Sequence, residues 1–366
     1  MLLTASVALA LSFALPQSQD RIFLRNGQVL SVDRIQSETY TEVTYRKGGS
    51  EGRKPANEVL SLEHSTVGRP LGEYADGVEL MTDGDFRRAM DRFEGALQDK
   101  DLASEARYAW VKQHALWNIM QCAAALGDLD VIIKTADRLL TAVPDSFFYA
   151  HSLLKKAEAL QDKNDAKGAE AIFKQLQADV GAKGLHEEWA RKAELGLVLL
   201  DRSLPAAEKQ RKLEGIAEKN KGSPEFADVA SRARVEVGNA MVEAGQYKDA
   251  QTRFQSIIAG GTTDGTILAG AYSGLGDCAF NLAVAAQADP AKANPLFEDA
   301  ALHFLRVAAT YPEAYRLAPR AMCFAGLAMS NMGKRPDALQ MARKLKGNYP
   351  NSVWKQKLFD TLGLAG

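Results

Sequence analysis

Three patterns of apolar and polar residues follow one another along the chain. Residues 1–16, MLLTASVALALSFALP, are apolar and contain no charged side chain. Short runs of alternating character occupy residues 20–66, and a period of two predicts strands. From residue 70 onward, apolar and small residues recur at the spacing of helices. We therefore predict a mainly α chain with a leading segment at 1–19, a small antiparallel β domain at 20–66 and a helical domain at 70–366.

Turn residues divide the β segment into strands. The dipeptide Asn26-Gly27 separates two apolar segments, which predicts a hairpin with a type I′ turn. A second alternating run at 41–46 is followed by Gly48-Gly49, which turns the chain toward a further strand at 58–62. The four to five short strands resemble small SH3-like or Sm-like barrels in topology only. Such a module either binds a partner or caps the first helix of the region that follows.

The helical region repeats one arrangement of small and large residues. In the first copy Gly77 precedes Gly84, and Ala89 stands four residues before Phe93. Small residues allow two helices to cross closely, and the large residue fills the space beside the crossing. Three copies in the same phase indicate an array of helical hairpins. The other two copies are Gly238, Gly245, Ala250 and Phe254, and Gly326, Gly333, Ala338 and Pro350.

This arrangement resembles the tetratricopeptide (TPR) repeat over about residues 70–350. The small-residue position of each first helix falls at 77, 120, 157, 196, 238, 276 and 326, with Met at position 120. The resemblance implies a TPR-like α-solenoid of about seven helical hairpins, with repeats longer than the usual 34 residues. It is degenerate in the fourth unit, whose second helix lacks the Ala-x3-Phe signature. Hairpins of this kind stack on their neighbours, and terminal units need a polar or covered outer face.

The resemblance also implies a binding surface. In the family, the first helices of the hairpins line a concave groove that holds a peptide or a partner helix, at fixed positions around the small residue. Trp117 and Arg232 are of residue types that supply contact area and directional hydrogen bonds at binding hot spots, and Trp117 equally suits packing between hairpins. The groove positions transferred to this chain are His114, Trp117, Gln121, His151, Glu158, Gln161, Arg232, Asn239, Glu243, Arg320 and Asn331.

Composition and charge narrow the class of partner. The chain has 366 residues, with 45 Lys and Arg against 46 Asp and Glu, and a formal charge of −1. Because it has no overall basic field, we do not expect nucleic-acid binding. Cys122, Cys278 and Cys323 form no C-x-x-C pair, which favours buried thiols over a zinc site or a disulfide framework.

Motifs for catalysis are not found in the sequence. Ser273 stands one place too late for the G-x-S-x-G nucleophile elbow, and the glycine-rich segment 260–265 lacks the lysine of a phosphate-binding loop. His186 does not begin an H-E-x-x-H motif, and the five histidines are scattered without a partner at metal-ligand spacing. We therefore expect no enzymatic activity, no cofactor and no metal site.

The apolar run at the start of the chain predicts export. Its length matches the h-region of a signal peptide and falls short of the roughly 20 residues that span a bilayer. Ser12 and Ala14 provide small residues for cleavage after Ala14. The alternative is a buried apolar helix, which Pro16 and the polar residues after it disfavour. We expect an exported, periplasmic or extracellular protein whose mature form has no integral membrane segment.

These patterns together favour a non-catalytic adaptor or scaffold. It would bind another protein or a peptide in the concave groove, in cell-envelope assembly or transport. Two alternatives stay open, a structural subunit that self-assembles through its repeat faces and the scaffold of an envelope enzyme. Sequence patterns do not distinguish a monomer from an oligomer.

Overall fold

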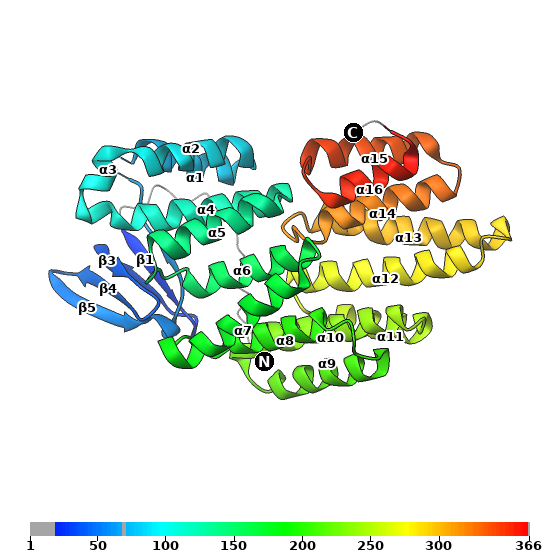
Figure 1. Ribbon diagram of the computed structural model, residues 1–366, viewed down its shortest axis with the longest axis horizontal. Coiled ribbons are helices and arrows are strands. Elements are labelled where there is room, and N and C mark those ends of the chain that lie inside the picture. Colours follow the sequence, from blue (N-terminus) through cyan, green and yellow to red (C-terminus); the bar gives the residue numbers. More distant parts are fainter. Residues whose placement is uncertain (1–18, 68–70, 365–366) are drawn as a thin grey trace. The chain divides into compact units, whose positions relative to one another are not determined.

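The computed structural model describes residues 19–67 and 71–364 (Figure 1). The predicted signal segment, apart from its last residue, and the predicted boundary at 68–70 lie outside the described residues. The chain divides into two compact units near Asp201. The first unit contains the strands and the helices up to residue 200, except for Ala124–Asp128. These residues, which include the end of α4, group with the second unit, which contains the helices that follow.

Six strands form two antiparallel sheets of three strands each within the described residues. β1 (Asp20–Leu24) lies between β2 (Val29–Val32) and β6 (Val59–Glu63), and β4 (Glu42–Lys47) lies between β3 (Arg34–Glu38) and β5 (Ser50–Pro55). This confirms the prediction of a small antiparallel β region ahead of the helices.

Glycines make both of the predicted tight turns. Gly27 has a φ of +84° in the turn between β1 and β2, where a side chain would strain the backbone. Gly48 and Gly49 join β4 to β5, whereas the sequence analysis expected them to lead directly to residues 58–62. The sequence of β5, SEGRKP, has no large apolar residue, so its strand character leaves no alternating pattern.

The helices of the first unit follow one another mostly in antiparallel pairs (Figure 1). They are α1 (Gly72–Thr82), α2 (Phe86–Gln98), the short α3 (Lys100–Ser104), α4 (Ala109–Leu126), α5 (Leu129–Ala142), α6 (Tyr149–Asp162), α7 (Ala166–Lys183) and α8 (Glu188–Leu200). The second unit continues the pattern with eight more helices among the described residues. These are α9 (Ala206–Asn220), α10 (Ala227–Glu243), α11 (Tyr247–Ala259), α12 (Gly265–Ala285), α13 (Pro290–Thr310), α14 (Ala318–Asn331), α15 (Arg335–Asn348) and α16 (Val353–Leu362).

The predicted pairing of small and large residues holds the hairpins together. A Cβ atom placed on Gly77 of α1 would lie 2.7 Å from the ring of Phe93 on α2, closer than real Cβ contacts allow. The same test on Gly238 of α10 gives 2.5 Å to the ring of Phe254 on α11. Phe93 and Phe254 are both fully buried. Because neither glycine has a Cβ atom, a phenylalanine of the paired helix can pack directly against the backbone.

One turn is repeated between the paired helices. The N–H of Asp85 donates to the carbonyl of Leu80 at 2.9 Å, and Asp165 repeats this bond with Leu160 at the same length. The residue before each aspartate adopts the left-handed conformation, with φ of +79° at Gly84 and +62° at Asn164. Asn tolerates this conformation better than other side chains, so the third hairpin keeps the turn without glycine. The hairpins are thus structural repeats in their turns as well as in their cores.

Strands and helices of the first unit share one hydrophobic core. Ile22, Ile35 and Val43 of the two sheets are buried together with Leu116 of α4 and Leu139 of α5. The residues of the predicted β domain therefore fold against the helical array. Their independence as a separate domain stays a prediction.

The strands reach the beginnings of three helices in the array. Gln113 of α4 donates to the carbonyl oxygen of Glu38 at 3.2 Å, and the N–H of Tyr40 donates to the loop that precedes α6. Arg25 forms an ion pair with Glu188, the first residue of α8. We call residues 20–63 the β bracket, because they contact three successive hairpins of the stack.

Among the described residues, α12 is one helix that is long and apolar enough to cross a membrane. Within the structure, 61% of that apolar stretch is buried. Its small residues lie against neighbouring helices, as Gly274 does beside Phe254 and Gly276 beside Phe304. Packing in the array therefore accounts for its composition.

Candidate functional site

A row of aromatic side chains crosses the helices α4, α6 and α8. Trp117 of α4 stacks on Phe148, with ring centroids 5.0 Å apart and 7° between the planes. His151 of α6 contacts Trp117 at 5.4 Å and Trp189 of α8 at 4.4 Å between centroids. We call Trp117, Phe148, His151 and Trp189 the aromatic row. The structure thus brings together two of the predicted groove residues, Trp117 and His151, in adjacent hairpins.

Two lysines lie over the indole rings of the aromatic row. The Nζ of Lys155 is 5.7 Å from the ring centroid of Trp117, and the Nζ of Lys192 is 5.1 Å from that of Trp189. Ammonium groups in this position are attracted to the ring face. The sequence analysis missed both lysines and Trp189.

His151 has one ring nitrogen that is shielded from solvent. Its Nδ1 is inaccessible to solvent and has no hydrogen-bond partner among the described residues. Burial lowers the pKa of His151 to about 3, because a charged imidazole is poorly solvated there. The ring is therefore neutral near neutral pH and acts as part of an aromatic surface.

His114 occupies a different place from the other predicted groove residues. Its side chain is only 8% exposed, and its Nε2 lies 2.9 Å from Oε2 of Glu38. The ring is enclosed between α4 and the β bracket, so a partner in the groove does not reach it. The prediction for His114 is corrected accordingly. The helical pattern of α4 gave no sign that strands cover its first turns.

The remaining predicted residues of the first unit lie on α4 and α6, two of the three helices that the aromatic row crosses. Gln121 of α4 and Glu158 and Gln161 of α6 are partly exposed. The Oε1 of Gln121 is buried and has no hydrogen-bond partner among the described residues. Their role in binding a partner stays a prediction.

In the second unit, the predicted residues on α10 are engaged with nearby side chains. Asn239 donates to Oε2 of Glu236 at 3.0 Å, and Glu243 is 2.9 Å from the Nζ of Lys209 on α9. Arg232 is partly buried on the same helix. Glu243 is exposed, so of these side chains it is the most accessible to solvent.

On α14, Arg320 is fixed by α12. Its guanidinium donates to Oγ of Ser273 at 2.9 Å and to Oδ1 of Asp277 at 2.7 Å. Burial raises the pKa of Asp277, and Arg320 opposes that effect. At the other end of α14, Asn331 accepts a hydrogen bond from Gln287 at 3.2 Å. Arg320 and Asn331 therefore link α14 to its neighbours in the array.

A buried polar cluster lies between the β bracket and α4. Oε1 of Glu38 is 3.1 Å from Nε2 of His64, and Oε2 of Glu38 is 2.9 Å from Nε2 of His114. Asp20 lies on the far side of His64, with Oδ2 3.5 Å from Nδ1. The ring of His64 stacks on Trp110 with 3.8 Å between centroids. Two histidines of the five thus meet at one carboxylate.

Electrostatics in this cluster follow from its burial. Burial alone would raise the pKa of Glu38, but His114 and His64 outweigh it and lower the pKa to about 2. Burial lowers the pKa of His114. For His64, burial is outweighed by Glu38 and Asp20, which raise its pKa. The Glu38 carboxylate is therefore ionised, and imidazole nitrogens are its neighbours on both sides.

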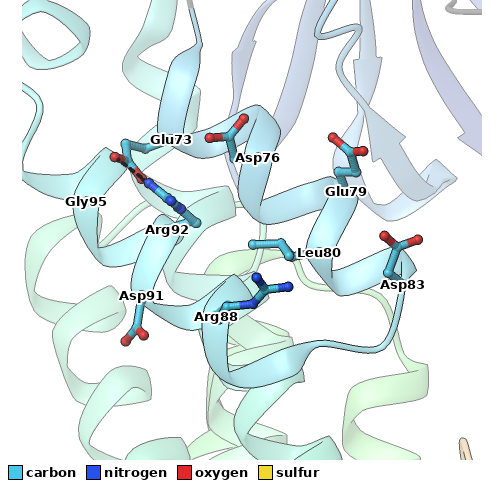
Figure 2. A pocket seen from close by; sticks show the side chains of 9 residues that line it. All are labelled: Glu73, Asp76, Glu79, Leu80, Asp83, Arg88, Asp91, Arg92 and Gly95. Atoms are coloured by element: carbon cyan, nitrogen blue, oxygen red, sulfur yellow. Dashed lines mark hydrogen bonds and ion pairs between the residues drawn. The ribbon is translucent and has the colours of Figure 1, made fainter.

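The end of the array at α1 and α2 carries an open polar pocket of about 610 Å³. Figure 2 shows Arg92 extending toward Glu73, the carboxylates of Asp76 and Glu79 on α1, and that of Asp83 just after the helix ends. Arg92 NH1 lies 2.9 Å from Oε2 of Glu73. This composition agrees with the expectation that a terminal hairpin has a polar outer face.

Comparisons with known proteins agree with the repeat architecture. The tetratricopeptide repeat family matches residues 325–352, which include the end of α14 and α15. No curated protein matches the chain. Among solved structures, a tetratricopeptide repeat protein from Parabacteroides merdae is 13% identical, with a TM-score of 0.44 over 80% of this chain and 97% of that one.

Two further solved structures match over most of the chain. A Rap protein in complex with competence and sporulation factor is 16% identical, with a TM-score of 0.41 over 71% of this chain and 75% of that one. PilW, a type IV pilus biogenesis factor, is 16% identical, with a TM-score of 0.27 over 78% of this chain and 96% of that one. The repeated hairpins and the family match over residues 325–352 together give the chain a TPR-like α-solenoid fold, which is typical of protein-interaction scaffolds.

Proposed function

We propose that the chain is a non-catalytic scaffold that binds another protein or a peptide along a surface formed by the first helix of each hairpin. The aromatic row is the observation that carries this proposal. Trp117 is partly exposed, its ring stacks on that of Phe148, and the ammonium group of Lys155 lies over it. A partly exposed indole with an ammonium group 5.7 Å from its ring centroid provides both apolar contact area and directional polar contacts, which are the features of binding hot spots.

A photocrosslinking experiment tests this surface. Benzoylphenylalanine placed at Gln121, one turn from Trp117, is expected to crosslink a partner in the native cell extract. The matched control is the same group at Lys174 of α7, whose side chain is 65% exposed. Trp117→Ala combined with the probe at Gln121 should reduce the yield at least tenfold. Equal crosslinking from both positions, or a yield unchanged by Trp117→Ala, would contradict the proposed surface.

The same experiment separates the adaptor from a self-assembling subunit. A crosslinked product at twice the mass of the chain, together with a mass that rises with concentration in light scattering, would favour self-assembly. A heterologous product and a concentration-independent monomer favour the adaptor.

We also propose that the protein acts outside the cytoplasm, in cell-envelope assembly or transport. Support comes from the apolar segment 1–16 and the polar residues after it. Fractionation followed by N-terminal sequencing tests this. The expected result is a periplasmic or secreted chain that begins after Ala14, and a full-length cytoplasmic chain would overturn the proposal.

A further inference from the structure

The cluster between the β bracket and α4 has the composition of a metal site. One ligand atom each from Glu38, His64 and His114 can be chosen so that all lie within 4.8 Å of one another. All three side chains are at most 8% exposed. Carboxylate oxygen and two imidazole nitrogens are a common ligand set for zinc.

The surroundings orient these groups as they would around a metal. Asp20 faces Nδ1 of His64, the nitrogen opposite the one that faces Glu38. Asp20 is itself fixed by the N–H groups of Ile35 and Ser65, at 2.8 and 2.9 Å. A carboxylate on the outer nitrogen of a ligating histidine sets its tautomer and raises its basicity. Gln113 of α4 holds the backbone of Glu38 from the other side.

The charges in the cluster also favour a bound cation. Asp20 and Glu38 bring two buried carboxylates into the site, with 0% and 5% of each residue exposed. Buried carboxylates need a compensating positive charge close to them. A divalent cation would neutralise both carboxylates and leave both imidazoles neutral.

We propose that Glu38, His64 and His114 bind one zinc ion, with Asp20 as the outer partner of His64. The ligands come from the end of β3, the residue after β6 and the first turns of α4. The zinc would therefore join the β bracket to the helical array, and a water molecule would complete the tetrahedral site. Its role would be structural, because the three ligand side chains are enclosed between the strands and α4. Metal ligands bind in their deprotonated form, so binding should weaken as the pH falls.

Metal content and calorimetry on the full chain test the proposal. Protein stripped with a chelator and titrated with Zn²⁺ should bind one equivalent, and its thermal unfolding should shift upward, whereas Mg²⁺ should have no effect. Co²⁺ in the same site should give the intense visible absorption of tetrahedral coordination. Binding below one equivalent, or only the weak spectrum of octahedral cobalt, would overturn the proposal without any variant.

Variants then assign the ligands. His64→Gln and His114→Gln should each weaken zinc binding by 100-fold or more, and Asp20→Asn by about 10- to 100-fold, because it removes only the outer partner. His303→Gln is the matched control, since that histidine lies on α13 of the second unit with a 24% exposed side chain. If a ligand variant fails to fold, the cobalt spectrum and stoichiometry of the wild-type chain still decide the question. Affinity unchanged in both histidine variants, or equally weakened by His303→Gln, would refute the assignment.

Discussion

Arg25, in the turn after β1, forms an ion pair with Glu188, the first residue of α8, across 163 positions of sequence. The side chains are only 16% and 10% exposed. Glu188 has a second cation in Lys192, at 3.1 Å. The pair therefore connects the β bracket to the last helix of the first unit in a place with little water.

Removal of Arg25 should destabilise the first unit. Arg25→Ala leaves the buried Glu188 carboxylate with Lys192 and His186 as its neighbours, and we expect a loss of about 1–3 kcal/mol in the free energy of unfolding. Urea denaturation followed by tryptophan fluorescence measures this, since Trp110, Trp117 and Trp189 lie in the first unit. Arg88→Ala is the control, because the Arg88 side chain is 68% exposed, and it should leave the transition midpoint unchanged. Equal shifts for the two variants would contradict the importance of the buried pair.

His151 should make stability depend on pH. Its pKa is about 3 in the folded chain against an ordinary value of 6.5, so the unfolded chain takes up the proton first as the pH falls. Its contribution to stability is complete above pH 6.5 and is lost between pH 6.5 and 3. At pH 5 the loss amounts to about 2 kcal/mol at most. The charged groups that act on the ring are Glu188, Lys192, Arg25 and Lys155.

The measurement compares wild type with His151→Gln in urea at pH 8 and pH 5. The wild-type chain should lose more stability than the variant over this interval, because the variant has no imidazole to protonate. Parallel losses in the two proteins would show that His151 is already solvated in the folded state.

Two glycines in the second unit should respond oppositely to alanine. Gly238→Ala would place a Cβ atom 2.5 Å from the ring of Phe254, so we expect a loss of about 1–3 kcal/mol. Gly215 lies inside α9 with no atom within 4 Å of the added carbon, and Gly215→Ala should stabilise by up to about 1 kcal/mol through helix propensity. Thermal unfolding of both variants checks the signs. A destabilised Gly215→Ala or a neutral Gly238→Ala would contradict the packing described for α9 to α11.

All three thiols should be unreactive in the folded protein. Cys122, Cys278 and Cys323 are buried and free, and burial raises the pKa of each, to about 12 for the first two and about 11 for the third. A thiol needs its thiolate form and access to react. Labelling with a thiol reagent at pH 8 should therefore be slow until urea unfolds the chain, when three equivalents react. Rapid labelling of any of the three in the native state would disprove the buried position of that cysteine.

Much of the repeat architecture was predictable because it depends on local signals. Gly77 and Phe93 occupy one hairpin, and their types alone indicate that two helices cross there. The turn at Asn26-Gly27 is likewise a property of two neighbouring residues. Signals of this kind survive in a single sequence because each depends on a few residues near one another.

The buried cluster was not predictable in the same way. His64 and His114 stand 26 and 76 residues from Glu38, and no spacing rule connects them. They meet only because β3 and β6 are placed over α4, an arrangement that depends on the whole of the shared core. The sequence analysis therefore expected no metal site and placed His114 in the groove. For the same reason it proposed Trp117 but not Lys155, whose position over that ring depends on how two hairpins stack.

In a stack where each hairpin contacts only the adjacent hairpins, small changes at each contact add up, so the pitch of the superhelix changes easily. The β bracket contacts α4, the loop before α6 and α8, so it connects three successive hairpins to the same group of strands. A change in the pitch of this part of the array would break several of these hydrogen bonds and ion pairs at once. A molecule that docks on the first unit therefore meets a stiff frame and loses little conformational freedom in shaping it.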